Sequence, residues 1–263
     1  MNRNLTRLAG TFAGIALAVS VAMPALAASG PNTRVSDRTV APLSAETDAA
    51  HCAAAWRTVR TDRTLANVQA VGFCEIDRRL VTIDRLQALV READVLTDAH
   101  ASALTRILDH AETGLKALRR EIAADTTVAS ATEDVRRIFT EYRIYALVTR
   151  QVALVRADDR VDAAVNRLTH AADQLAAAIA RAAGNGKDVT VAQGHLDAMI
   201  AAIAEARAEV AGDASAVLAQ TPATWNSGTA KPILDAARAS IAAARSDLRI
   251  ALTEAQAVLA ALR

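Results

Sequence analysis

Alanine-rich heptad rows in the C-terminal half constrain the fold of this chain more than any other feature. Three segments carry a large apolar residue every seven positions, and two of them add a small residue three positions later. This alternation is typical of helices that pack closely in a coiled-coil manner, and a strict period of seven predicts left-handed supercoiling. The rows are Leu154, Val161, Leu168, Leu175 and Ala182 with Ala157, Ala164, Ala171 and Ala178; Val189, Leu196, Ile203, Val210 and Val217; and Leu234, Ile241, Leu248, Ala255 and Leu262 with Ala237, Ala244, Ala251 and Val258.

Glycine-rich and polar breaks separate these three segments. Gly184-Asn185-Gly186 divides the first two, and residues 221–231 divide the last two, with Pro232 at a favoured first helical position. Each segment has about 30 residues, which span ~45 Å at 1.5 Å per residue. Because the lengths are equal and the connections short, we predict antiparallel neighbours.

The N-terminal half shows a similar but less regular periodicity. Breaks are expected at residues 94–98, where Thr97 is a candidate N-cap, and at residues 125–129. The next helix is expected to run from 130 to 183, with a bend near Thr149. The apolar rows are Ile76, Ile83 and Val90 with Leu80 and Leu86, and Leu108, Leu115 and Ile122 with Leu104, Ala111 and Leu118.

Composition favours an all-α fold. Hydrophobic residues make up 52% of the chain but aromatic residues only 3%, because about a quarter of all residues are alanine, the best helix former. A sheet protein would need more turn residues and more β-branched or aromatic strand residues than this chain has. We predict an all-α, elongated antiparallel helical bundle with heptad, alanine-rich seams.

The first 27 residues predict an export signal. Arg3 and Arg7 precede an uncharged apolar run at 8–21, Pro24 follows, and Ala25-Leu26-Ala27 is a small-x-small cleavage box. A membrane anchor is the alternative, but the run is shorter than the ~20 residues that span a bilayer. We expect cleavage after Ala27 or one residue later, which leaves a secreted or extracytoplasmic product with no transmembrane anchor.

Four segments follow from these patterns. The signal peptide (1–27) precedes a flexible leader at 28–43, which is rich in Gly, Pro, Ser and Thr. Ser44 is a candidate N-cap of the first helix. Residues 44–125 are expected to form an N-terminal helical hairpin region and residues 126–263 a bundle of long helices, together one continuous domain.

Two cysteines, Cys52 and Cys74, are compatible with a disulfide in an exported chain. On one continuous helix they would be ~33 Å apart, far beyond bonding reach. A hairpin that turns near Arg63, within the polar run 61–64, would bring them level. An internal bridge, buried free thiols and an intermolecular bond are the alternatives.

Aromatic residues are few, and three of the seven lie close together in one segment. Phe139, Tyr142 and Tyr145 recur at three-residue spacing, which places them on one broad helical face. Core filling where helices diverge is the interpretation that this spacing favours, and a ligand groove is the alternative. Trp225 lies in a loop, where it either packs over a bundle end or contacts a partner.

An acidic cluster at Asp158, Asp159 and Asp162 is the one candidate for a hard cation. Arg156 and Arg160 are interleaved with it, which favours a salt-bridged helix surface instead. The five histidines are scattered and form no metal-ligand spacing. We therefore predict no metal site and no cofactor.

No residue pattern has the spacing of a catalytic or phosphate-binding motif. No serine lies in a nucleophile elbow, and the glycines at 184 and 186 lack the preceding strand of a phosphate loop. The net charge is +1, with Arg and acidic residues interleaved throughout, so no basic stripe for nucleic acid is present.

Several motifs between about residues 70 and 263 carry a family resemblance. They are Glu75-Ile76-Asp77-Arg78-Arg79-Leu80 with Leu86, Ile122-Ala123-Ala124-Asp125-Thr126, Tyr142-Arg143-Ile144-Tyr145-Ala146-Leu147-Val148, and Thr221-Pro222-Ala223 with Trp225-Asn226. With them the chain resembles a family of uncharacterised secreted, coiled-coil-like helical proteins of high-GC bacteria. Members often have Pro-Lys after the tyrosine motif, where this chain has Thr149-Arg150-Gln151. The resemblance implies fold and export but no activity.

Long matched helices present large side surfaces rather than a concave pocket. We therefore predict a non-enzymatic structural or interaction protein of the cell envelope or extracellular space, whose partner is a protein, an envelope component or, through the alanine seams, a second copy. One alternative is a binding module for an apolar or lipid ligand between helices near Tyr142 and Tyr145, which requires a cavity there. Another is a secreted hydrolase, which requires titratable groups that converge in a cleft.

Overall fold

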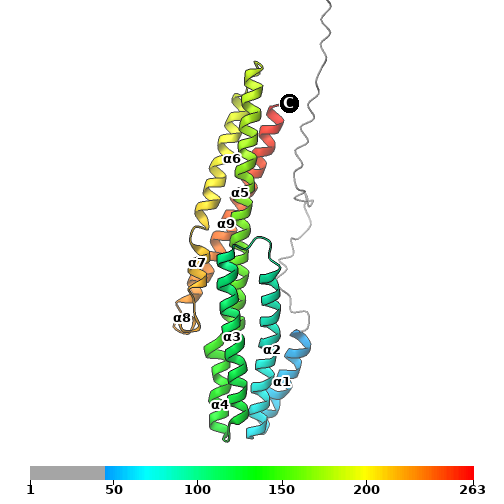
Figure 1. Cartoon of the computed structure of the whole chain (residues 1–263), viewed down its shortest axis with the longest axis vertical. Helices are drawn as coiled ribbons and strands as arrows, with labels where there is room; N and C mark the ends of the chain where they lie inside the picture. Colours follow the sequence, from blue (N-terminus) through cyan, green and yellow to red (C-terminus); the bar gives the residue numbers. More distant parts are fainter. Residues whose placement is uncertain (1–44) are drawn as a thin grey trace, which may run out of the picture. The chain divides into compact units, whose positions relative to one another are not determined.

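Helices account for every regular element that the structure describes, which confirms the all-α prediction for this part of the chain. The structure is a computed structural model that describes residues 45–263, with side chains from Cys52 onward; the predicted signal peptide, leader and Ser44 cap lie outside these residues. The elements, drawn in Figure 1, are α1 (Ala45–Thr61), α2 (Leu65–Arg91), α3 (Asp98–Ala124), α4 (Val128–Arg137), the π-helices η1 (Ile138–Tyr142) and η2 (Ile144–Val148), α5 (Thr149–Gly184), α6 (Thr190–Glu209), α7 (Asp213–Leu218), α8 (Pro222–Asn226) and α9 (Ala230–Ala261).

Threonine caps set the helix starts in the N-terminal half. The hydroxyl oxygens of Thr64, Thr97 and Thr127 each accept a hydrogen bond from the backbone N–H three residues later, at 3.2–3.3 Å. Each cap satisfies one of the N–H groups that a helix start leaves unpaired. The predicted Thr97 cap is thus confirmed, and the gap between α3 and α4 falls within the predicted break at 125–129.

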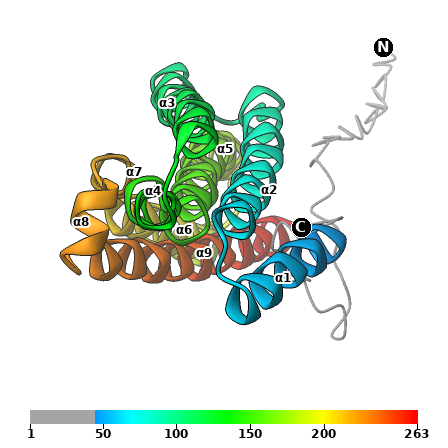
Figure 2. The same cartoon turned by 90° about the horizontal axis from the view of Figure 1, so that it is seen from below.

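Cross-helix hydrogen bonds fix α2 and α3 as antiparallel neighbours. Gln87, late in α2, donates to Asp109 early in α3 at 3.0 Å, whereas Asp77, earlier in α2, accepts from Arg119 late in α3 at 3.2 Å. Helix α1 packs against α2, on the side away from α3 (Figure 2). The apolar rows of α2 and α3 are buried between the helices, Leu80 being only partly so.

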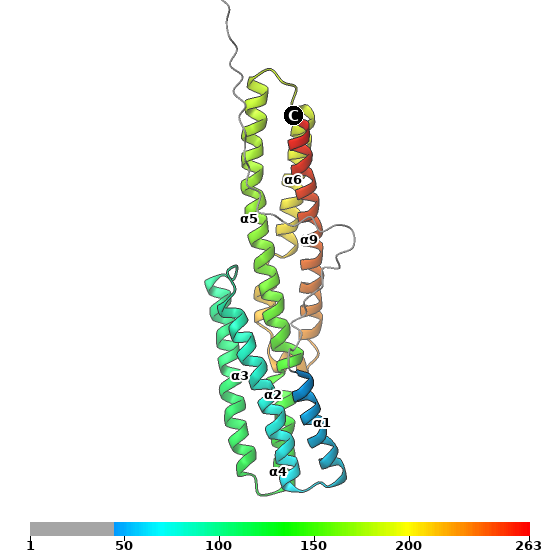
Figure 3. The ribbon, with the colours of Figure 1, turned by 90° about the vertical axis from the view of Figure 1, so that its right-hand side faces the viewer.

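Helices α6 and α9 are antiparallel neighbours too. At one end Lys187 donates from Nζ to the carbonyl of Leu262 at 3.1 Å, and further along Nδ1 of His195 lies 2.7 Å from Oε2 of Glu254. Helix α5 packs against both of them (Figure 3). The small-residue row of α9 is buried along its whole length, which lets its partners approach closely: Ala237, Ala244, Ala251 and Val258. None of the described helices is long and apolar enough to cross a membrane.

Two helix boundaries in the C-terminal half differ from the predicted ones. The second segment is not one long helix, because α6 ends at Glu209 and Gly212 adopts a left-handed conformation with φ 86° before α7 begins. Glycine tolerates this conformation, and so the chain turns there. The break at 221–231 contains the short helix α8, capped by Thr221, and α9 begins at Ala230 rather than at Pro232.

The expected bend near Thr149 is wrong in position. The helical path from α4 to α5 is interrupted at Arg143, whose φ of 48° is left-handed, between two single π-helical turns. The side chain of Asn226 in α8 stabilises this interruption, since it donates to the carbonyl of Thr140 at 2.8 Å and accepts from Nε of Arg143 at 2.8 Å. Single π-turns of this kind are a known cause of helix kinks.

The buried face of α5 matches the predicted seam only in part, at Val161 and Leu175. The predicted alanines at 157, 164, 171 and 178 are only half-buried. A neighbouring row with the same period of seven is buried instead: Gln151, Asp158, Val165, Ala172 and Ile179. The reason is that α5 packs against α6 and α9 together with the end of α7, so its contact face is wider than one two-helix seam.

Gly114 in α3 allows the Tyr142 ring to pack closely. A Cβ at Gly114 would lie 2.5 Å from a ring carbon of Tyr142. We expect Gly114→Ala to lower the free energy of unfolding by about 1 kcal/mol, because overpacking outweighs the gain in helix propensity. Urea unfolding checks this. Gly194→Ala in α6, which has no neighbour within 4 Å of the new Cβ, should instead raise stability by about 0.5–1 kcal/mol. Equal changes in stability from Gly114→Ala and Gly194→Ala would contradict the close packing of Tyr142 against Gly114.

Candidate functional site

The predicted disulfide is formed between neighbouring helices. Cys52 of α1 and Cys74 of α2 are bonded, with Cα atoms 5.5 Å apart. Helix α1 ends at Thr61 and α2 begins at Leu65, so the turn lies at the polar run around Arg63. Of the alternatives, the structure therefore has the internal bridge across a helical hairpin.

A buried ion pair lies next to this disulfide. Glu75 and Arg79 are 3% and 4% exposed, and Nη1 of Arg79 donates to Oε2 of Glu75 at 2.5 Å. The indole N–H of Trp56 in α1 donates to the other carboxylate oxygen at 2.9 Å. Burial alone raises the pKa of Glu75, but the hydrogen bonds from Trp56 and Arg79 and the nearby positive charges outweigh it and hold the pKa below its ordinary value.

Two of the candidate groove residues surround this ion pair. The Arg79 guanidinium lies 4.6 Å from the ring centre of Phe139 and 5.1 Å from that of Tyr145. The Trp56 and Phe139 rings are 6.3 Å apart at a tilted angle. The space between these aromatic rings is thus occupied by Arg79, a cation–π arrangement. We call Glu75, Arg79, Trp56, Phe139 and Tyr145 the Arg79 cluster.

The other two candidate residues lie elsewhere. The Tyr142 ring lies against Gly114 of α3. Trp225 of α8 contacts the guanidinium of Arg150, 5.8 Å from its ring centre. An open hollow in the described part of the chain is lined by four residues of α1, Trp56 among them, and by neither tyrosine. The four predicted residues therefore do not form one site.

The Arg79 cluster gives a pH prediction. Because the pKa of Glu75 is lowered in the folded state, its ionised form stabilises the fold above the ordinary value of 4.5, and this contribution is lost as the pH falls through the lowered pKa. We expect the stability of the wild type to fall more steeply than that of Glu75→Gln between pH 5 and pH 3. Urea unfolding across that interval measures it. If the stability of the two proteins changed with pH in parallel, ionised Glu75 would not contribute to the stability of the fold.

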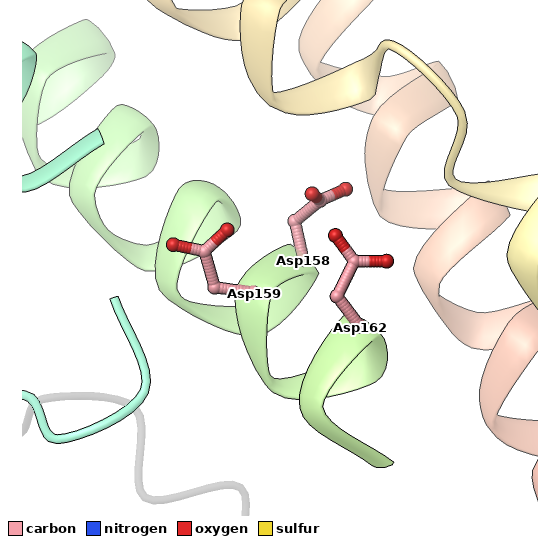
Figure 4. Close-up of side chains that lie close together, drawn as sticks. All are labelled: Asp158, Asp159 and Asp162. Carbon is pink, nitrogen blue, oxygen red and sulfur yellow. The ribbon is translucent and has the colours of Figure 1, made fainter. Parts of the chain in front are cut away.

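The acidic cluster is not the salt-bridged surface that the sequence favoured. Asp158 and Asp159 are 4% and 2% exposed, and the hydrogen bonds of Asp159 go to α3 rather than to the interleaved arginines. Its two carboxylate oxygens lie 2.9 Å from the backbone nitrogen of Thr97 and 2.7 Å from Nδ1 of His100. Figure 4 shows how Asp158, Asp159 and Asp162 project from one stretch of α5.

The electrostatics of this cluster are unusual for a helix surface. Burial, with the negative charges of Asp162, Asp159 and Asp213, raises the pKa of Asp158 to about 7. Burial and Asp159 also raise the pKa of Asp162. Neither Oδ1 of Asp158 nor Oδ2 of Asp213, at the start of α7, has a hydrogen-bond partner, although both atoms are buried. Close carboxylates in such surroundings need a shared proton or a cation.

The sequence pattern did not predict that the Glu75–Arg79 pair and the aspartates of α5 are buried. A signal for Asp158 exists, because it stands seven positions from Gln151 and from Val165 in the row that α5 buries. Glu75 and Arg79 flank the apolar row of α2, at i−1 and i+3 from Ile76. A charge pair at i, i+4 is usually a solvated face, so the pattern alone did not distinguish the two environments.

Comparison with family models, with curated proteins and with solved structures finds no match for this chain. The resemblance to secreted helical proteins of high-GC bacteria therefore stays a prediction.

Proposed function

We propose that this chain is an exported, non-enzymatic structural or interaction protein of the cell envelope or extracellular space. The observation that carries the proposal is the Cys52–Cys74 disulfide. Disulfides persist in oxidising compartments and are rare in the cytosol, so the bond agrees with the export signal in residues 1–27. As part of the same proposal, we infer that the helices form an elongated bundle with coiled-coil seams.

An exposed tyrosine beside arginine supports the interaction part. Tyr145 is 40% exposed, and the guanidinium of Arg78 lies 4.9 Å from its ring centre. Tyr, Trp and Arg are the residues that contribute most to binding at protein interfaces. We assign the partner-binding face to Tyr145, at the exposed edge of the Arg79 cluster, and to the neighbouring Arg78.

The alternative functions have less support. An apolar ligand near the tyrosines would need a cavity, and the space beside Tyr145 is taken by the Arg78 and Arg79 guanidinium groups. A hydrolase would need its titratable groups in a cleft. Asp158 and Asp159 do converge, but their burial leaves a substrate no access to them.

In-cell photo-crosslinking tests the proposal. A photo-reactive residue at position 82, beside Tyr145, should give a crosslinked product of discrete mass in the extracytoplasmic fraction, and mass spectrometry identifies the partner or a second copy. Tyr145→Ala should weaken the crosslink several-fold. Ile250→Ala, at a 49% exposed position of α9, should not. A chain that stays in the cytoplasm, or a crosslink that both variants leave unchanged, would contradict the proposal.

A further inference from the structure

The acidic cluster of α5 has an unmet acceptor at its centre. Asp158, Asp159 and Asp162 each offer one carboxylate oxygen, and these atoms lie within 4.8 Å of one another (Figure 4). Asp158 is 96% buried, given its 4% exposure, and its Oδ1 has no hydrogen-bond partner. A buried carboxylate oxygen left in this way is rare in folded proteins and calls for a ligand or a proton.

The surroundings leave the negative charge of the cluster uncompensated. Asp213 of α7 adds a fourth acidic group, and its Oδ2 is also buried without a partner. His100 is hydrogen-bonded to Asp159, and the charge of Arg207 acts on Asp162. Three other carboxylates raise the pKa of Asp158, so negative charge is concentrated at this point of α5, as a cation site requires.

Asp159 is held in the way that a metal-binding carboxylate usually is. Thr97 donates its backbone N–H to Oδ2, and His100 lies against Oδ1, so the orientation of the carboxylate is fixed from α3. Ligating carboxylates commonly accept such outer hydrogen bonds while a free lone pair binds the ion.

We propose that Asp158, Asp159 and Asp162 bind one hard divalent cation, with Ca²⁺ the ion that the spacing favours. Three carboxylates and no thiolate form a ligand set for hard cations. Ca²⁺ binds oxygens at about 2.3–2.6 Å, so oxygens up to about 5 Å apart can share one ion, whereas Mg²⁺ at about 2.0–2.1 Å reaches only about 4.2 Å. The 4.8 Å span of the three oxygens agrees with Ca²⁺.

The ion would lie where the two main core clusters of the fold meet. Val155 belongs to the cluster shared with α2 and α3, and Val161 to the cluster shared with α6 and α9. Asp158, Asp159 and Asp162 lie beside this boundary. Thr97 and His100 of α3 and its cap bind Asp159, and the charge of Asp213 in α7 acts on Asp158. Bound Ca²⁺ thus stabilises the join between the two halves of the bundle.

Calorimetry on the purified protein, treated with EDTA and then dialysed, tests this proposal. Titration with CaCl₂ should show one site per chain, with a Kd in the range of about 10⁻⁴–10⁻³ M or tighter and weaker binding of MgCl₂. Saturating Ca²⁺ should raise Tm by several degrees, since an ion that binds only the folded state stabilises it. Asp158→Asn and Asp162→Asn should each weaken Ca²⁺ binding at least tenfold. Asp173→Asn, at an exposed position of the same helix, should leave binding unchanged.

Three results would overturn the proposal. They are no heat and no Tm shift at about 10 mM Ca²⁺, well above the Kd of weak Ca²⁺ modules; equal binding by Asp158→Asn and Asp173→Asn; and tighter binding of Mg²⁺ than of Ca²⁺. Asp162 is exposed, so Asp162→Asn keeps the test decisive if circular dichroism shows that Asp158→Asn does not fold.

Discussion

Replacing Arg79 with methionine is expected to lower the free energy of unfolding by about 3 kcal/mol. Removing one partner of a buried ion pair leaves the other charge without compensation, which typically costs about 3–5 kcal/mol. The lower end applies here, because Arg78 still pairs with Glu75 at 2.9 Å. The variant also loses the cation–π contacts to Phe139 and Tyr145. Urea unfolding followed by circular dichroism measures the change.

Two further variants separate the ion pair from general packing. In Glu75→Gln/Arg79→Met no charge is left buried, so much of the lost stability should return, and glutamine can still accept from Trp56. Arg136→Ala removes one partner of an exposed pair, with side chains 64% and 58% exposed, and should leave the free energy of unfolding nearly unchanged. If Arg79→Met were as mild as Arg136→Ala, the buried pair would not stabilise this fold.

Removing the disulfide is expected to have a comparable effect. The Cys52–Cys74 bond closes a loop with a sequence separation of 22, for which chain-entropy arguments give about 3 kcal/mol. We expect Cys52→Ala/Cys74→Ala to lose about that amount in guanidinium unfolding. Because α1 packs mainly on α2, the loss should concentrate there, and hydrogen exchange should accelerate in α1 amides before those of α6 and α9.

A chemical control accompanies this variant. Dithiothreitol should lower the stability of the wild type to that of Cys52→Ala/Cys74→Ala and leave the variant unchanged. Wild type and variant with equal stability under oxidising conditions would mean that packing alone holds α1 in place.

Much of the helix layout followed from local signals in the sequence. The apolar rows of α2, α3 and α9 predicted these helices and their buried faces. Thr97 predicted the start of α3, which its side-chain hydroxyl caps. These features depend on residues within one or two helical turns. Periodicity and capping are therefore sufficient to find them.

Features that depend on distant residues could not be predicted in this way. The interruption at Arg143 is stabilised by Asn226, 83 positions away. The burial of Asp158 and Asp159 arises because α3 and α7 meet α5 at that point, which no periodicity of α5 encodes. Likewise, Arg79 is buried because Phe139 and Tyr145 cover it from the π-helical turns. Tertiary packing determines each of these features. A charged residue alone suggests a surface position, so the sequence pattern pointed the other way.

The export of a disulfide-linked helical chain is the central proposal, and an intact-mass measurement tests it most directly. The protein is recovered from the extracytoplasmic fraction of its own cells, under conditions that trap free thiols, and weighed. We predict a chain that begins at Ala28 or one residue later, lacks the two cysteine hydrogens and takes up no thiol reagent. A chain that retains residues 1–27, remains in the cytoplasm and carries two modified cysteines would contradict it.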